Sequence, residues 1–220
     1  IIPTNPTLIN FQKIFSNLPF ARWFFNSALV ATVSTLGTLL VCALAGYTFA
    51  KKEFFGKRVL FSLLLATLMI PSALMLIPAF LVTNSLHLVN TYGGLILPGM
   101  GSAMGVFLLR QFIETLPSEL EQAALIDGAS EIGVFTRIIL PLSKPGLTTL
   151  AILHFTGSWN ALIWPLIVVN SKALYTLPLG VALMRTEFQV DYGAVSAAAM
   201  VSIVPLVVAF IFLQRYFIGG

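Results

Sequence analysis

The chain has 220 residues, of which 58% are apolar and 9% are charged, whereas a soluble domain carries about 25% charged residues. Too few charges remain to cover a globular surface, so a soluble enzyme is excluded, and so is a disordered chain, which needs high charge. The net charge of +4 calls for no nucleic-acid partner, because membrane proteins collect basic residues in cytoplasmic loops. The sequence therefore predicts an all-α integral membrane protein.

Cysteine and histidine are too sparse for a metal centre or a disulfide framework. The one cysteine, Cys42, lies in an apolar run, and the two histidines are far apart, at positions 87 and 154. We therefore expect no metal site and a small buried role for Cys42.

Stretches without charged residues mark five membrane spans. The segment 59–109 is too long for one helix and is divided by polar residues near 84–94. The apolar runs are continuous rather than alternating, which predicts helices rather than barrel strands. The expected spans are 23–50, 59–83, 92–113, 145–170 and 193–214, with a loop at 114–143, all in one transmembrane domain, residues 1–220.

The distribution of basic residues predicts the orientation. Placing the loops 51–58 and 110–144 and the C-terminus in the cytoplasm leaves eight of the twelve Lys and Arg residues inside. The reverse orientation breaks the positive-inside rule two to one. Residues 1–22 are therefore expected outside the cytoplasm, and an odd number of spans calls for one further span before residue 1.

The loop 114–143 holds five of the eight acidic residues. Ser118 and Glu121 have the spacing of a capping box that starts a short helix, and Gly128 is placed to end it with positive φ. A second helical run, 131–140, is expected to stop at Pro141. Small residues on one face and acids around them favour docking into a groove of a soluble partner. The alternative is a helix on the bilayer surface, which calls for basic residues and a bulky apolar face.

The same loop resembles the EAA loop of ATP-binding-cassette importer permeases. The resemblance is carried by Gln122-Ala123-Ala124, by Gly128, and by Ile138 with Leu140-Pro141. Gln122 stands where the family usually has Glu, although Glu121 adjoins it. The resemblance implies these ATPase-coupling residues: Glu121, Gln122, Ala123, Ala124, Asp127, Gly128, Ile138, Leu140 and Pro141.

Further segments resemble the carbohydrate branch of that family, the maltose-type and glycerol-3-phosphate-type permeases. They occur in order at 26–27, 46–47, 55–58, 110–112, 158–160, 164–166, 175–178 and 214–216. The resemblance implies a type I importer permease fold with a cytoplasmic coupling helix, and a sixth span and a short tail outside this sequence. It also implies a bacterial or archaeal cytoplasmic membrane as the location.

The implied partners are a second homologous permease, two cytoplasmic ATPase subunits that hold ATP and Mg²⁺, an extracytoplasmic solute-binding protein and the lipid bilayer. The chain itself is expected to bind no cofactor. It has no G-x-x-x-x-G-K-[ST] loop, since Gly56-Lys57 is followed by Arg58, so no enzymatic activity is expected of this chain alone.

The predicted spans contain no Asp or Glu, the groups that proton- and sodium-driven carriers place in the membrane. An uncharged pathway suits a sugar or polyol-type solute moved by alternating access, with energy supplied from outside the chain. One alternative is a secondary carrier or channel that acts without an ATPase. Another is an amino-acid or peptide importer of the same superfamily.

Three residues of the fourth span are candidates for the solute pathway. Trp159 and Asn160 lie roughly 21 Å along the helix from Pro145, at about 1.5 Å per residue. An indole face suits a sugar ring and an amide suits a hydroxyl, and His154 lies deeper in the span. The alternative is that Trp159 and His154 pack within the bundle and that Asn160 bonds a neighbouring helix.

Overall fold

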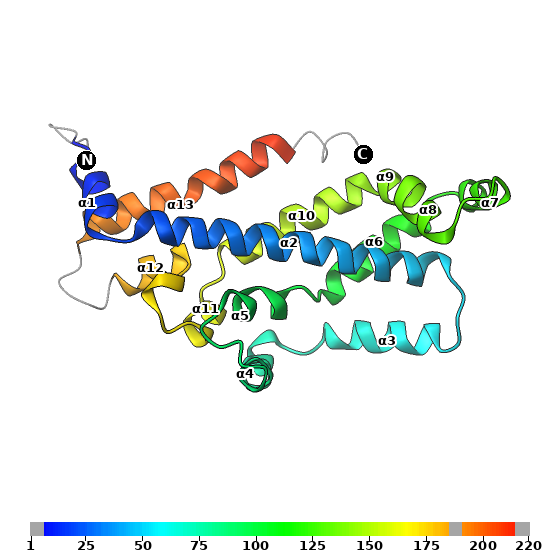
Figure 1. The fold of residues 1–220 in the computed structure, drawn as a ribbon, viewed down its shortest axis with the longest axis horizontal. Helices are drawn as coiled ribbons and strands as arrows, with labels where there is room; N and C mark the ends of the chain where they lie inside the picture. Colours follow the sequence, from blue (N-terminus) through cyan, green and yellow to red (C-terminus); the bar gives the residue numbers. More distant parts are fainter. Residues whose placement is uncertain (1–6, 185–190, 214–220) are drawn as a thin grey trace.

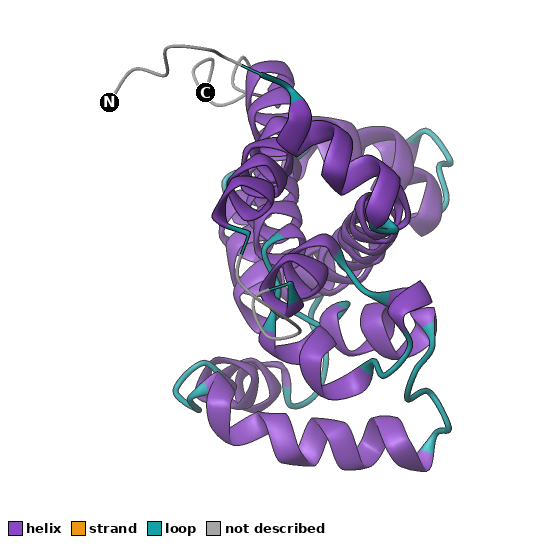
Figure 2. Cartoon of the chain, turned by 90° about the vertical axis from the view of Figure 1, so that its left-hand side faces the viewer, coloured by secondary structure: helices purple, strands orange, loops and turns teal. Residues whose placement is uncertain are grey.

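The computed structural model describes residues 7–184 and 191–213, and every regular element in these ranges is helical, as predicted (Figure 2). Predicted features at Arg185 and in the segment 214–220, including the C-terminus, lie outside the described residues. The elements are α1 (Ile9–Asn17), α2 (Phe20–Lys51), α3 (Lys57–Thr67), η1 (Ser72–Met75), α4 (Leu76–Ser85), α5 (Tyr92–Ile96), η2 (Leu97–Gly99), α6 (Ala103–Glu114), α7 (Ser118–Ile126), α8 (Glu131–Val134), the π-helical η3 (Phe135–Ile139), α9 (Leu140–Leu142), α10 (Lys144–Trp159), α11 (Ile163–Val168), η4 (Lys172–Leu174), α12 (Leu177–Leu183) and α13 (Tyr192–Leu213).

The helix α2 runs along the long axis of the molecule and packs against α6 and α10 (Figure 1). Small residues allow the close approach of these helices. A Cβ added at Gly46 of α2 would lie 3.1 Å from the Arg110 backbone nitrogen of α6. A Cβ added at Gly105 would lie 2.8 Å from Cys42 Sγ. Cys42 is fully buried at this contact, which confirms its expected role.

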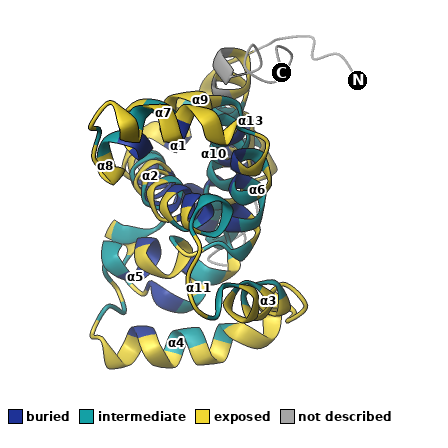
Figure 3. Ribbon diagram, turned by 90° about the vertical axis from the view of Figure 1, so that its right-hand side faces the viewer, coloured by how far each residue is buried: buried dark blue, intermediate teal, exposed yellow. Residues whose placement is uncertain are grey.

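The helix α2 contributes buried residues to all three hydrophobic clusters of the described core, whereas α3 and α4 are mostly exposed (Figure 3). Large apolar side chains on the outer helices are open, among them Leu63 of α3 and Ile77 of α4. Contiguous exposed apolar surface is typical of membrane contact or of contact with another subunit. The exposure therefore fits a chain that lies in a bilayer.

Two of the five predicted spans, 59–83 and 92–113, are bent rather than straight. Among the described residues, α2 alone is long and apolar enough to cross a membrane as one helix. The pair α3 and η1–α4 bends by 98° and the pair α5–η2 and α6 by 45°. Pro71 lies at the first break and Pro98 lies in η2, just before the second. Proline removes a helical hydrogen bond, which favours a break nearby. Counting each bent pair as one span gives up to four crossings, so five spans stays a prediction.

Candidate coupling site and solute cavity

The helix α7 lies at the end of the molecule toward which the C-terminus of α2 points (Figure 1). Gly128 ends it with φ +86°, which confirms the predicted positive φ. The Ala129 N–H donates to the Ala124 carbonyl at 2.9 Å and the Gly128 N–H donates to Leu125 at 3.1 Å. These two bonds form a Schellman motif, which satisfies the last carbonyls and fixes the direction of the following chain.

The predicted capping box at the start of α7 is wrong. The residue before the helix is Pro117, and no side chain caps the first turn. Ser118 is already the first helical residue, and its Oγ lies 3.4 Å from Lys51 Nζ. The Glu121 carboxylate is not available to the backbone, because a stronger, charge-assisted set of partners from α2 holds it.

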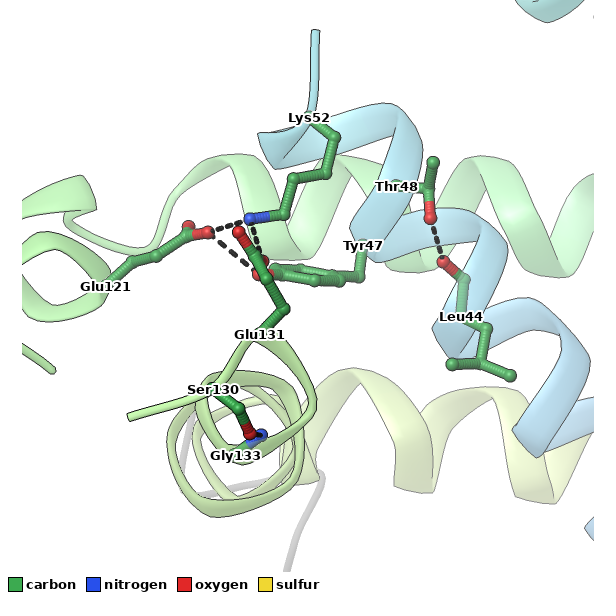
Figure 4. Close-up of polar contacts among 8 residues, drawn as sticks. All are labelled: Leu44, Tyr47, Thr48, Lys52, Glu121, Ser130, Glu131 and Gly133. Carbon is green, nitrogen blue, oxygen red and sulfur yellow. Dashed lines mark hydrogen bonds and ion pairs between the residues drawn. The ribbon is translucent and has the colours of Figure 1, made fainter. Parts of the chain in front are cut away.

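Those partners form a cluster of four side chains at the end of α2, which we call the Lys52 cluster: Tyr47, Lys52, Glu121 and Glu131 (Figure 4). Lys52 Nζ lies 2.6 Å from Glu121 Oε1 and 2.5 Å from Glu131 Oε2. The Tyr47 hydroxyl donates to Glu121 Oε1 at 2.7 Å, and Lys52 Nζ lies 5.0 Å from the centre of the Tyr47 ring. One ammonium group therefore joins α2 to both α7 and α8.

The surroundings of this cluster keep its charges ionised. Glu121 is only 8% exposed; its burial raises the pKa of the carboxyl group, but hydrogen bonds from Lys52 and Tyr47 outweigh that effect and lower the pKa overall. Burial likewise lowers the pKa of Lys52, and its hydrogen bonds to Glu121 and Glu131 outweigh this and raise the pKa. Both groups are therefore charged at neutral pH, and the ion pair persists there.

Most of the remaining predicted residues in and just after α7 face outward. Gln122, Ala123, Asp127 and Gly128 are exposed, whereas Ala124 is half-buried. Apolar side chains extend this open surface, with Ile126 85% exposed and Leu120, Leu125 and Ile132 also open. The outward surface of α7 is therefore mostly neutral around Gln122. This surface carries bulky apolar residues, whereas the sequence predicts a face of small residues.

The second helical run of the loop begins at Glu131, as predicted, but it does not stop at Pro141, and this prediction is wrong. It continues through α8, the π-helical η3 and α9 to Leu142. The Leu140 N–H bonds the Phe135 carbonyl, five residues back, so the wider π turn replaces the regular bonding that proline prevents. The sharp bend, 74°, comes after Leu142, before α10. Ile138 and Leu140 are half-buried, and Pro141 is exposed.

A cavity of about 450 Å³ lies between α2, α10 and the bent segments at η1–α4 and η2. Its size is within the range of small-molecule sites, which are mostly apolar with a few polar groups. Ser34 and Ser158 meet in it at 3.1 Å between their hydroxyl oxygens. The described lining contains no charged Asp, Glu, Lys or Arg; it comprises Ser34, Ser72, Met75, Leu76, Ala79, Leu95, Pro98, Gly99, Leu153, His154, Gly157, Ser158, Ala161 and Trp164.

The structure separates the three pathway candidates. His154 lines this cavity, with Nε2 3.0 Å from both Thr38 Oγ1 and the Gly99 carbonyl. Trp159 does not line it; it is 1% exposed, packs on Phe24 and donates from Nε1 to the Ser202 carbonyl at 3.1 Å. Asn160 is exposed and donates to the Thr156 carbonyl of its own helix.

Sequence reasoning missed the long-range partners both in the Lys52 cluster and in the cavity. Lys52 and Tyr47 are about seventy residues from Glu121, and no local spacing links them. The same holds for Ser34 and Ser158, which are 124 positions apart. Among the described residues, no group of three His, Cys, Asp or Glu side chains gathers where it could hold a metal ion.

Residues 37–218 match the family model described as binding-protein-dependent transport system inner membrane component. The arabinooligosaccharides transport system permease protein AraQ of Halalkalibacterium halodurans is 42% identical over 219 residues, which cover 99% of this chain and 78% of AraQ. The sulfoquinovosyl glycerol transport system permease protein SmoH of Agrobacterium fabrum is 35% identical, over 99% of this chain and 77% of SmoH. The sn-glycerol-3-phosphate transport system permease protein UgpE of Escherichia coli O1:K1 is also 35% identical, over 100% and 81%.

The fold is that of a type I importer permease. A crystal structure of a bacterial ABC transporter involved in the import of the acidic polysaccharide alginate superposes with a TM-score of 0.87 at 23% identity, covering 99% of this chain and 82% of that one. The fold and the family match together define the class of ATP-binding-cassette transporter permeases. The chain belongs to the family of binding-protein-dependent transport system inner membrane components. The relatives above are named for the transport of arabinooligosaccharides, sulfoquinovosyl glycerol and sn-glycerol-3-phosphate, which confirms the resemblance to the carbohydrate branch.

Proposed function

We propose that this chain is one transmembrane subunit of an ATP-driven importer that moves a sugar or related polyol-type solute across the cytoplasmic membrane by alternating access. Its partners are a second homologous permease, two cytoplasmic ATPase subunits and an extracytoplasmic solute-binding protein. The C-terminus lies in the cytoplasm and the segment before α2 lies outside. The single observation that supports this function best is the geometry of α7: a short helix held at the end of α2, with Gln122 and Ala123 turned outward.

Coupling to the ATPases goes through residues 117–141. The outward face of α7 enters a groove on an ATPase subunit, where its exposed apolar side chains, Leu120 and Ile126 among them, lose contact with water. The Schellman end at Gly128 sets the angle at which α7 leaves the bundle. ATP and Mg²⁺ belong to the ATPase subunits and supply the energy there. In this chain, the face of α7 docks and the Lys52 cluster holds α7 in place.

The solute pathway includes the cavity between α2 and α10. Its lining is uncharged and mostly apolar, with the hydroxyls of Ser34 and Ser158 and the imidazole of His154 as polar groups. Hydroxyl and imidazole groups can both donate and accept hydrogen bonds, which suits a solute rich in hydroxyls. AraQ, SmoH and UgpE are named for arabinooligosaccharides, sulfoquinovosyl glycerol and sn-glycerol-3-phosphate, which supports a carbohydrate or polyol for this chain.

Reconstitution tests the function directly. The chain is placed in proteoliposomes with its partner permease, with and without the ATPase subunits, and uptake of labelled arabinose oligomers is measured with the solute-binding protein outside. We expect uptake only with the ATPases and ATP, because the spans carry no acidic group for ion coupling. Solute flux through the permeases without any ATPase would establish the carrier or channel alternative instead.

Substitution of His154 tests the solute cavity. His154→Ala is expected to raise the KM for uptake by about 2- to 10-fold, the value of one net hydrogen bond, because it removes the bonds to Thr38 and Gly99 that shape the cavity wall. His154→Gln should be affected less. Asn160→Ala is the matched control, because Asn160 lies outside the cavity lining and bonds its own helix. A raised KM in Asn160→Ala with a normal KM in His154→Ala would instead assign the solute contact to Asn160.

A further inference from the structure

We propose that Lys52 is the positioning residue that ties α2 to the coupling loop, so that α2 transmits movement of α7 to the solute cavity and to the outer segment 172–177. The inference rests on the proposed function and names the side chain that carries the coupling inside this chain. Contacts along the whole length of α2, from its cytoplasmic end to its outer end, support it.

At the cytoplasmic end, the link to α2 is a buried, charge-assisted contact rather than loose packing. Glu121 is buried, and its carboxylate accepts from both Lys52 and Tyr47. Lys52 also pairs with Glu131 of α8. Because a buried carboxylate without its partner is strongly destabilising, α7 cannot move away from α2 without cost. Displacement of α7 and α8 therefore carries the end of α2 with it.

The helix α2 is suited to transmit that displacement. It is continuous over 32 residues, or roughly 48 Å at about 1.5 Å per residue. The three bent helix pairs among the described residues turn by 45° or more, and the unbroken α13 is shorter, at 22 residues. Coupling through proteins is carried by rigid elements with specific contacts at both ends. An unbroken helix fixed at one end meets that requirement better than the bent pairs.

In its middle, α2 forms one wall of the solute cavity. Ser34 bonds Ser158 of α10, and Thr35 and Thr38 bond the two ring nitrogens of His154 at 3.3 and 3.0 Å. A shift of α2 relative to α10 therefore changes the spacing of the polar groups that line the cavity.

At its outer end, α2 holds the segment 172–177 through three buried side chains. Asn26 Nδ2 donates to the carbonyls of Ala173 and Tyr175 at 2.9 and 2.8 Å. The Ser27 hydroxyl accepts from the Leu177 N–H at 2.8 Å, and Trp23 Nε1 donates to the Lys172 carbonyl at 3.2 Å. A displacement of α2 at Lys52 therefore also moves the segment 172–177 at the opposite face of the membrane.

The experiment uses the reconstituted complex and measures three quantities: ATPase co-purified with the permeases, the rate of ATP hydrolysis, and solute imported per ATP. Lys52→Met keeps an apolar stem but removes the charge. We expect ATPase binding to stay within about twofold of the wild type while solute imported per ATP falls at least about fivefold, the low end of measured coupling between sites. Lys52→Arg, which restores the ion pair, is expected to recover coupling.

A double-mutant cycle and a matched lysine give the controls. Glu121→Gln and Lys52→Met act on one contact, so their effects on solute per ATP should not add. Lys57→Met removes a charge from the same end of the molecule, but within the described part of the chain Lys57 pairs only with Glu53, four residues away, and coupling should stay normal. If the complex with Lys52→Met does not assemble, Tyr47→Phe tests the cluster instead, because it removes only a single hydroxyl.

The outcomes separate the two proposals. Normal solute per ATP in Lys52→Met, Glu121→Gln and Tyr47→Phe, with ATPase bound, would overturn the role of Lys52 and leave the proposed function intact. An equal loss in Lys57→Met would also overturn it, because the effect would then follow from charge alone. Failure of the wild-type chain to bind any ATPase would overturn the proposed function itself.

Discussion

Replacing Gly128 with valine is expected to lower ATP-dependent uptake at least about tenfold while the chain still inserts into the membrane. Gly128 has φ +86°, a conformation that costs a residue with a side chain about 1 to 3 kcal/mol, and most for a β-branched one. An added Cβ meets no heavy atom within 4 Å, so the penalty comes from the backbone conformation rather than from a clash at Cβ. About 1.4 kcal/mol changes an equilibrium constant tenfold, so this penalty is large enough to open the Schellman motif. The helix α7 then loses its fixed angle.

Gly56 provides a control with the same local strain. It also has positive φ, +79°, and open space around its Cβ position, but it lies between α2 and α3 rather than in the coupling loop. Gly56→Val should keep solute imported per ATP close to normal, and Gly128→Asn should recover much of the uptake, because asparagine tolerates positive φ. Uptake is measured in proteoliposomes and insertion by the yield of monodisperse complex. Normal uptake in Gly128→Val would remove Gly128 from the coupling site.

Replacing Trp159 with alanine is expected to destabilise the chain rather than to weaken solute binding. Trp159 is one of the largest fully buried side chains, and loss of a buried tryptophan costs about 3 to 5 kcal/mol. The same change leaves the Ser202 carbonyl on α13 without its indole donor. A lower unfolding temperature of the purified protein in detergent, together with a poor yield, is the expected result.

Trp159→Phe separates packing from hydrogen bonding, because it keeps a ring against Phe24 and Phe155 and loses only the N–H. Its unfolding temperature should lie between those of the wild type and Trp159→Ala. A stable Trp159→Ala protein with a raised KM for solute would contradict a core position and restore Trp159 to the solute pathway.

The loop 114–143 shows how far local sequence reasoning extends. Helix α7, its end at Gly128 and the start of α8 at Glu131 follow from spacings of three to ten residues, because caps and turns are local interactions. Glu121 is different: local spacing predicts a backbone cap, but the structure assigns its carboxylate to Lys52 and Tyr47. A charged amine from another helix outcompetes a backbone amide for a buried carboxylate, and nothing within the loop indicates it.

Pro141 shows the same limit. Locally, a proline predicts the end of a helix, yet the run continues to Leu142 through a π turn. The buried side chains of Phe135 and Ile139 pack in the core on either side of this turn, so tertiary packing holds the helix together across the proline. The bend falls instead at Ser143, between α9 and α10.

The sequence by itself determined the class of protein: an apolar, helical membrane chain with its acids gathered in one loop, of the ATP-binding-cassette permease family. Those properties follow from composition, charge placement and short motifs, which do not depend on distant contacts. The tertiary structure decided which side chains face one another: it turned Glu121 inward to Lys52, buried Trp159 against α13, and brought Ser34 and Ser158 together around a cavity. Such contacts join residues more than forty positions apart, and only the packing of whole helices brings them within bonding distance.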